Sequence, residues 1–281
     1  MLSRTRLGSL SEISPKATFE AIKESLIPLK KSPFDEYMTL QLEKLHKKGK
    51  EVNHLGWVTL FCQVIAVEKK YNLQNADEAT VAKVQPLFQK AIDSMVKFGF
   101  DVNKDLVWQH NKPLHTAAEE GCRIVAACLI KLRARVNEYN YWEETPLYCA
   151  AFYSQTAVVA LLIKNKANVR KPSHVKLLDC NELPLHVATS PAVIELLVSA
   201  GTPVNATSTG KGAHFTALHW AAYCAQPEAV RTLRRLGAVD VVDQKYDTAL
   251  NVAEKIQKGT YSVMMNTLPG QNIRRTVRLL Q

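Results

Sequence analysis

A seven-residue pattern recurs along this 281-residue chain at an almost constant spacing. Its clearest copy is TALHWAA at residues 216–222. The other copies are KPLHTAA at 112–118, TPLYCAA at 145–151, LPLHVAT at 183–189 and the shorter TALNVA at 248–253. Their second residues are 113, 146, 184, 217 and 249, so the steps are 33, 38, 33 and 32. A period near 33 predicts small units that stack and bury a continuous core between them.

Each position of this pattern suits the start of a short helix. A threonine such as Thr216 at the N-cap accepts a bond from an unpaired backbone N–H, and a proline such as Pro146 in the first helical position loses no bond. The leucine is expected to enter the core, and the Ala-Ala pair lets helices approach closely. A second signal, as in Val204-Asn205, ends each unit and is often preceded by glycine, which suits the left-handed residue after a helix.

The two signals together resemble the ankyrin repeat, in which a turn, a T-P-L-H-x-A-A helix and a second helix are followed by G-A-D-V-N. The resemblance covers roughly Leu55 to Ile256. It implies an all-α fold: an ankyrin-repeat solenoid with N- and C-terminal helical caps. It also implies that the histidines of the pattern, His115, His186 and His219, bridge backbone groups of neighbouring turns rather than act in catalysis.

The chain divides into three parts on this interpretation. Residues 1–54 are expected to form an N-terminal helical cap with a mobile start, because apolar residues recur at helical spacing between 16 and 50. Residues 55–241 hold about five repeats, of which the first is degenerate and has an insertion near residues 71–78 or in a lengthened second helix. The fourth repeat has a long inter-repeat turn, so irregular stacking is expected there. Residues 242–281 are expected to form a partial repeat and a closing helix.

Composition limits the class of protein. Apolar residues make up 47% of the chain, yet no apolar run approaches the length of a membrane span. No secretory signal is evident at the N-terminus. The six cysteines show no C-x-x-C pair and lie mostly in apolar stretches, which favours reduced thiols and a cytoplasmic location, and zinc-ligand spacing is absent. The net charge of +10 is concentrated at the two ends, which could meet acidic proteins, anionic lipid or nucleic acid or simply be solvated.

Binding positions follow from the resemblance, because ankyrin stacks bind through the tips of their turns and the exposed side of the first helices. We single out these partner-binding candidates: Trp108, Glu119, Glu120, Tyr141, Trp142, Phe152, Tyr153, Lys211, Phe215 and Tyr223. Mapping the same turn and first-helix positions also gives Gln109, Asn111, Glu144, Asp179, Cys180, Glu182, Gly212, Ala213, Cys224, Gln244, Lys245 and Asp247. Trp220 is assigned to the core, since the position after the histidine usually packs against a neighbouring repeat.

Aromatic residues dominate this set, although they make up only 7% of the chain. Tyrosine and tryptophan are frequent anchors of protein interfaces because they bury much surface for little lost rotamer freedom. The alternative is that some of these rings fill gaps between turns. We expect Trp142, Phe152, Tyr153 and Phe215 to form an apolar patch, with Lys171, Lys176 and Lys211 as a basic rim.

Enzymatic interpretations find little support in the sequence. Gly210-Lys211-Gly212 lacks the spacing of a phosphate-binding loop. Cys62 with His46 or His54 is a conceivable Cys–His pair, but the segment around it is too short for a cysteine-hydrolase fold. No catalytic residue, cofactor or metal is therefore expected.

The sequence thus predicts a non-enzymatic, monomeric module that binds another protein through the concave ankyrin face. No nucleic-acid partner and no membrane span are expected. The style of the chain is similar to ankyrin effectors that intracellular bacteria deliver into host cytoplasm. The alternatives are an intracellular scaffold or adaptor of eukaryotic type, and a repeat domain that positions a small catalytic or lipid-binding module at the N-terminus.

Overall fold

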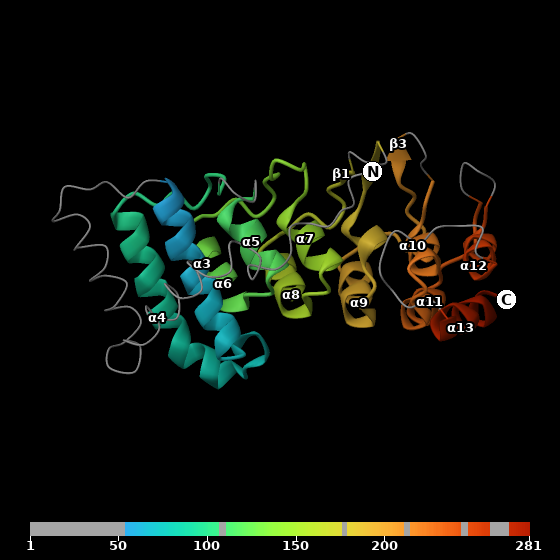
Figure 1. The fold of residues 1–281 in the computed structure, drawn as a ribbon, viewed down its shortest axis with the longest axis horizontal. Helices are drawn as coiled ribbons and strands as arrows, with labels where there is room; N and C mark the ends of the chain where they lie inside the picture. The colour runs from blue at the N-terminus through green and yellow to red at the C-terminus, as the bar shows by residue number, and fades with distance from the viewer. Residues whose placement is uncertain (1–53, 107–110, 176–178, 211–213, 243–246, 259–269) are drawn as a thin grey trace. The chain divides into compact units, whose positions relative to one another are not determined.

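The structure is a computed structural model that describes residues 54–106, 111–175, 179–210, 214–242, 247–258 and 270–281 (Figure 1). The described chain forms two compact units. Unit 1 comprises residues 54–106, 111–117 and 122–134, and unit 2 comprises residues 118–121 and the described residues from 135 to 281. The expected N-terminal cap and its mobile start lie outside the described residues, and the three-part division of the chain stays a prediction.

Unit 1 contains two helices far longer than those of the other repeats. Its elements are α3 (His54–Lys70), η3 (Leu73–Asn75), α4 (Glu78–Lys97), the start of α5 (Pro113–Glu119) and α6 (Arg123–Lys131). The helices α3 and α4 have 17 and 20 residues, and only a short 3-10 turn lies between them. The extra length expected in the first repeat is therefore accommodated by long helices, of which α4 begins with the Asp77 side chain accepting the N–H of Thr80 at 2.6 Å.

A buried carboxylate joins two of these helices. Glu68 on α3 is fully buried, and its two oxygens accept the N–H groups of Ile124 and Val125, each at 2.9 Å. These N–H groups belong to the first turn of α6, which has no partner for them within the helix. Burial raises the pKa of Glu68 to about 7, against these two bonds and the charge of Arg123, which lower it.

Unit 2 is built from short helix pairs in the order expected for repeats. They are α7 (Pro146–Phe152), α8 (Thr156–Lys164), η4 (Pro184–Val187), α9 (Pro191–Ser199), α10 (Ala217–Tyr223), α11 (Pro227–Arg235), α12 (Ala249–Gln257) and α13 (Gly270–Leu280). The hydroxyls of Thr145, Thr216 and Thr248 cap three first helices as predicted. Gly201 and Gly237 adopt the predicted left-handed conformation, with φ of 99° and 92°.

Asparagines at the ends of the units connect consecutive repeats. The amide of Asn137 donates to the carbonyl of Lys166 at 3.2 Å while its oxygen accepts the N–H of Asn168 at 2.7 Å. Asn205 repeats this arrangement one junction later, with the carbonyl of Gly237 and the N–H of Val239. The Val-Asn signal of the sequence is therefore a hydrogen-bonded link between neighbouring loops, which fixes their spacing.

The fourth repeat departs from the others, as its long turn predicts. Its first helix is only the 3-10 turn η4, and its inter-repeat segment folds into a hairpin of β1 (Ser173–Val175) and β2 (Cys180–Glu182). The two-residue strand β3 (Thr209–Gly210) pairs with β2, so the sheet order is β1-β2-β3 and both pairings are antiparallel. These strands lie among the turns, on the side of unit 2 away from α8, α9 and α11 (Figure 1).

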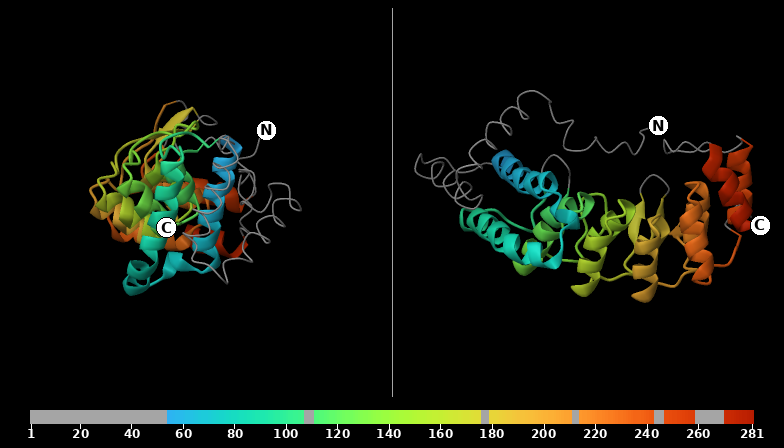
Figure 2. Two further views of the ribbon diagram at one scale, coloured as in Figure 1. Left: turned by 90° about the vertical axis from the view of Figure 1, so that its left-hand side faces the viewer. Right: turned by 90° about the horizontal axis from the view of Figure 1, so that it is seen from below.

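The last helix closes unit 2. The helix α13 packs against both α11 and α12 at the C-terminal side of the unit (Figure 2). Its Ile273, Val277 and Leu280 are buried. This placement confirms the predicted closing helix. None of the described helices is long and apolar enough to cross a lipid bilayer.

Candidate functional site

The histidines of the repeated pattern serve the fold. His186 accepts the N–H of Leu183 through Nδ1 at 2.8 Å, and its Nε2 lies 2.8 Å from the carbonyl oxygen of Ala206. His219 makes the equivalent bonds to the N–H of Thr216 and the carbonyl of Asp247. Burial lowers the pKa of His186 to about 4, although its bond to the carbonyl raises it. The predicted bridging role is confirmed for both residues.

Tyr148 occupies the histidine position of the third repeat and bridges in a different way. It is buried, and its hydroxyl donates to Oε2 of Glu182 at 2.9 Å. The same carboxylate lies 3.8 Å from the thiol of Cys180. A tyrosine is longer than a histidine, so it reaches a side chain of the next repeat instead of a backbone carbonyl.

The turn tip of the third repeat holds two exposed aromatic residues. Tyr141 is 55% exposed and Trp142 45% exposed, and their rings meet edge to face at 5.4 Å. Hydrogen bonds hold the backbone of this turn in place. Asn140 and Glu144 are hydrogen-bonded to each other, and the N–H of His174 in β1 donates to the carbonyl of Glu143 at 3.1 Å. Two large amphipathic rings therefore lie on a loop that hydrogen bonds already hold in place. This order lowers the conformational entropy that the loop loses when it contacts a partner protein.

The ends of two first helices carry further aromatic pairs. Phe152 and Tyr153 at the end of α7 meet edge to face at 5.2 Å, and Tyr153 is 36% exposed. Trp220 and Tyr223 on α10 stack at 5.6 Å, and both are half-buried. The assignment of Trp220 to the core is therefore wrong. Residues three apart on a helix share a face, so Trp220 lies on the same side of α10 as Tyr223.

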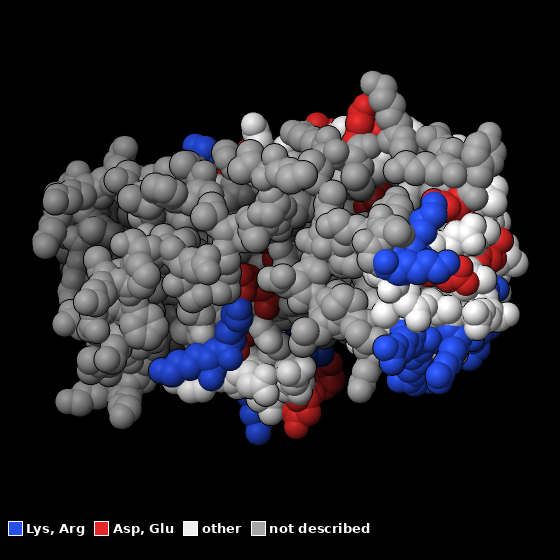
Figure 3. Space-filling model, turned by 45° about the vertical axis from the view of Figure 1, so that its right-hand side comes forward, with Lys and Arg blue, Asp and Glu red and all other residues white. Residues whose placement is uncertain are grey.

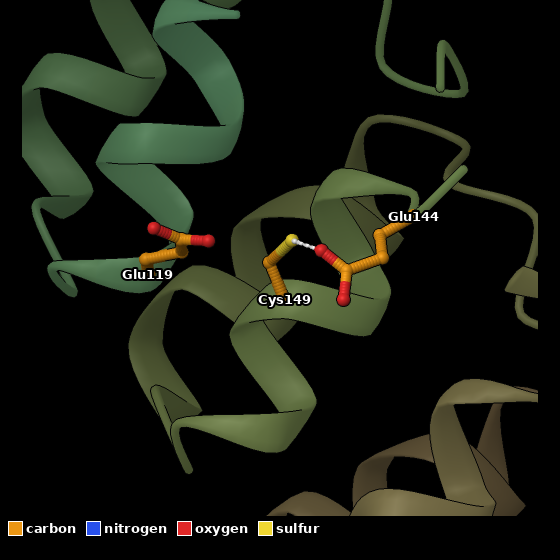
Figure 4. A group of neighbouring side chains, drawn as sticks. All are labelled: Glu119, Glu144 and Cys149. Atoms are coloured by element: carbon orange, nitrogen blue, oxygen red, sulfur yellow. Dashed lines mark hydrogen bonds between the residues drawn. The ribbon is translucent and has the colours of Figure 1, made fainter. Parts of the chain in front are cut away.

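Two acidic candidates lie on α5 and just beyond it. Glu119 and Glu120 are both half-buried. The carboxylate of Glu119 lies near Glu144 and the thiol of Cys149, with all three possible ligand atoms within 4.8 Å of one another (Figure 4). Glu144 is held by the amide of Asn140 at 3.1 Å and faces the thiol of Cys149 at 3.8 Å. One thiol and two carboxylates could ligate a metal ion, but the bonds to Asn140 and Cys149 account for the burial of Glu144 without one.

The remaining candidates are placed as follows. Phe215 is half-buried, with its ring 5.4 Å from that of His219. Trp108, Lys211 and Lys176 lie outside the described residues. Lys171, expected in a basic rim, is half-buried; its ammonium lies 3.8 Å from the ring centre of Tyr139 and donates to the carbonyl of Asn137. The charge of Lys171 is therefore used in contacts within unit 2 and does not form the expected basic rim.

Several turn and first-helix positions that the resemblance suggested as exposed are buried. They are Asn111, Glu144, Cys180, Glu182, Cys224 and Asp247, which are between 2% and 7% exposed. The acidic members have partners inside the fold, as Asp247 has in the ammonium of Lys255 at 2.6 Å. Buried carboxylates need such partners, because an unpaired charge is costly in the interior. These side chains stabilise the turns from inside the fold and do not face a partner protein.

The comparisons with known proteins agree with the repeat pattern. Family models for ankyrin repeats match residues 82–173, as three copies, and residues 214–245. Inversin of Canis lupus familiaris is 34% identical over 112 residues, and inversin of Homo sapiens is 33% identical over 112 residues. Each match covers 38% of this chain and 10% of inversin, so the chain spans about a tenth of the length of these relatives.

The family is established by several independent features. The Thr caps, the bridging His186 and His219, and the asparagine links recur at the period of the sequence pattern. The helical pairs of unit 2 lie in register with that period, and the family models match in both units. The chain is an all-α ankyrin-repeat protein.

Proposed function

We propose that this chain binds a partner protein through an aromatic face made of Tyr141, Trp142, Phe152, Tyr153, Trp220 and Tyr223. Ankyrin repeats are protein-interaction modules, and this fold leaves turn tips and first-helix ends available for contact. Five of the six are aromatic side chains that either end a first helix of unit 2 or form the turn tip of the third repeat. Trp220 joins them because it stacks on Tyr223.

The observation that carries this proposal is the exposed pair Tyr141 and Trp142. Among the described residues of unit 2, the exposed large apolar side chains are Tyr141, Trp142, Tyr153, Val239 and Val242. Three of these five belong to the third repeat, and all three are aromatic. A group of exposed aromatic rings on a braced backbone is typical of an interface anchor.

The proposed activity is binding without catalysis, cofactor or metal. The imidazoles of His186 and His219 are committed to backbone bonds, which supports a structural role for them. The alternative of a small catalytic or lipid-binding module concerns residues 1–54, which lie outside the described residues apart from the first residue of α3.

We further propose that the chain acts as a monomer in a reducing cytoplasm, its own or that of a host cell. All six cysteines are free thiols, and five of them are buried. Delivery into a host as a bacterial effector and service as an intracellular scaffold both agree with this chemistry. Identification of the partner protein would distinguish a bacterial effector from an intracellular scaffold.

Site-specific photo-crosslinking tests the proposed face. A photoreactive phenylalanine analogue replaces Trp142 in the full chain, which is then irradiated in a lysate of the producing cell and of a candidate host cell. A matched variant carries the same analogue at Ala160, which is exposed on the second helix α8. We expect a discrete crosslinked protein from position 142 and none from position 160. Equal labelling from both positions would contradict the proposal.

A further inference from the structure

Arginines gather on the outer side of two helices that pack together at the end of unit 2. The helices α11 and α13 carry six arginines and no lysine. Five of the six are exposed, and we call them the arginine surface: Arg231, Arg235, Arg274, Arg275 and Arg278. The sixth, Arg234, is half-buried and donates to the carbonyl of Leu280 at 2.9 Å, which ties the two helices together. Figure 3 shows basic side chains gathered at its lower right, on the side where α11 and α13 lie in Figure 1.

The carboxylate of Glu228 lies between the two helices of this surface. Glu228 pairs with Arg231 on its own helix at 2.9 Å and with Arg275 on α13 at 2.7 Å. A single carboxylate group thus fits between guanidinium groups from both helices. Carboxylates match the planar fork of arginine well, better than they match the ammonium of lysine.

Two other arginines of this surface have no carboxylate partner among the described residues. Arg274 and Arg278 are exposed and make no ion pair with any residue that the structure describes. They are four residues apart on α13, so their side chains lie on one face of the helix. The undescribed segment between α12 and α13, residues 259–269, contains no aspartate or glutamate.

We propose that the arginine surface binds an acidic segment of a partner protein, whose carboxylates pair with Arg274 and Arg278 as Glu228 pairs with Arg231 and Arg275. A helical segment with glutamates four residues apart would match the spacing of the two arginines. This surface shares no residue with the aromatic face, and its role does not depend on that face.

A membrane surface fits these residues less well. Helices that lie on bilayers bury an apolar face among the lipids. The apolar residues Ile273, Val277 and Leu280 of α13 are already buried in the protein. The outer side offers charges without an apolar group to insert.

Nucleic acid also fits less well than an acidic protein. Sequence-tolerant nucleic-acid sites combine basic groups with aromatic side chains on which bases stack, and α11 and α13 contain no aromatic residue. The carboxylates of Glu228 and of Glu195, which pairs with Arg235, lie among the arginines and would repel a continuous run of phosphates.

Fluorescence anisotropy with the full chain tests this inference. The probe is a fluorescein-labelled helical peptide with glutamates four residues apart, and its counterpart has glutamine at those positions. We expect the glutamate peptide alone to bind, and the double variant Arg274→Gln, Arg278→Gln to weaken it by about tenfold. The control Lys131→Gln, Lys164→Gln removes the same charge from exposed lysines elsewhere and should leave the affinity nearly unchanged.

A second variant is expected to gain affinity. Glu228→Gln frees Arg231 and Arg275 for the probe and should tighten binding by about threefold. Glu254→Gln, which changes the net charge equally on α12, should not. Equal effects of the arginine and lysine pairs would overturn the proposal, as would equal binding of the glutamine peptide. Binding of phosphatidylserine vesicles or single-stranded DNA without binding of the glutamate peptide would overturn it in favour of a membrane or nucleic-acid site.

Discussion

The hydroxyl of Tyr148 donates a hydrogen bond to the carboxylate of Glu182, and this bond joins the third repeat to the fourth within the protein core. The fourth repeat has only a 3-10 turn where its neighbours have a first helix. The bond from Tyr148 is one of the side-chain contacts that join these two repeats. The β1–β2 hairpin brings Glu182 to the position where Tyr148 can reach it.

Removing that hydroxyl should destabilise unit 2. In Tyr148→Phe the buried carboxylate of Glu182 loses a donor, which costs about 1–3 kcal/mol. The midpoint of urea unfolding measures this loss. Tyr153→Phe removes a hydroxyl from an exposed ring and is the matched control. An unchanged midpoint in Tyr148→Phe would show that the carboxylate is satisfied without the tyrosine.

The stability of unit 1 should fall as the pH rises from about 4.5 to about 7. Burial raises the pKa of Glu68 from 4.5 to about 7, so in this window the folded unit binds more protons than the unfolded chain. The loss across the window is on the order of 3 kcal/mol. The protection of the α6 backbone amides from hydrogen exchange, corrected for the intrinsic exchange rates, measures this loss of stability. In Glu68→Gln the pH dependence of that protection should vanish, and its persistence would assign the effect to another group.

The fourth repeat should show the opposite trend. Burial lowers the pKa of His186 to about 4, so the unfolded chain binds more protons between about pH 4 and the ordinary value of 6.5. Stability is therefore fully present above pH 6.5 and is lost as the pH falls towards 4. Hydrogen exchange of η4 and α9 should reveal this loss in the same experiment that follows Glu68. Protection of α9 that is constant from pH 7 to 4 would contradict the buried neutral imidazole.

Gly210 should tolerate alanine much less than Gly237 does. Both have left-handed backbones, with φ of 112° and 92°, so alanine strains each by about 1–2 kcal/mol. At Gly210 the added Cβ would also lie 2.5 Å from the carbonyl oxygen of Asp179, whereas at Gly237 it meets no atom within 4 Å. Thermal midpoints of Gly210→Ala and Gly237→Ala measure the difference. Equal midpoints would show that β2 and β3 can separate without loss.

Local features of the fold were predictable because their causes are local. The caps at Thr145 and Thr216, the left-handed Gly201 and the closing helix α13 follow from residue types at fixed positions. The link through Asn205 is a consequence of the period, since each loop meets a copy of itself one repeat later. Such contacts need no knowledge of which side chain faces which.

The predictions that failed concern side chains whose burial depends on the shape of a neighbouring segment. Trp220 is half-buried because its helix turns it towards Tyr223, whereas the pattern alone placed it in the core. Glu182 is buried because a hairpin forms around it and Tyr148 supplies a donor. The hydrogen bond between Glu68 and Ile124 joins residues 56 positions apart, and no local spacing in the sequence predicts it.

The aromatic face has a direct test once crosslinking has supplied its partner. Tyr141→Ala with Trp142→Ala should weaken binding of that partner by ~2 kcal/mol or more, which is about thirtyfold, and should leave the melting temperature nearly unchanged, because both rings are exposed. Leu147→Ala, which truncates a buried side chain of the same repeat, should instead cost ~2–5 kcal/mol of stability. Isothermal titration calorimetry of the double variant is the decisive measurement. Our account predicts this loss of affinity in a folded protein, and an unchanged affinity would contradict it.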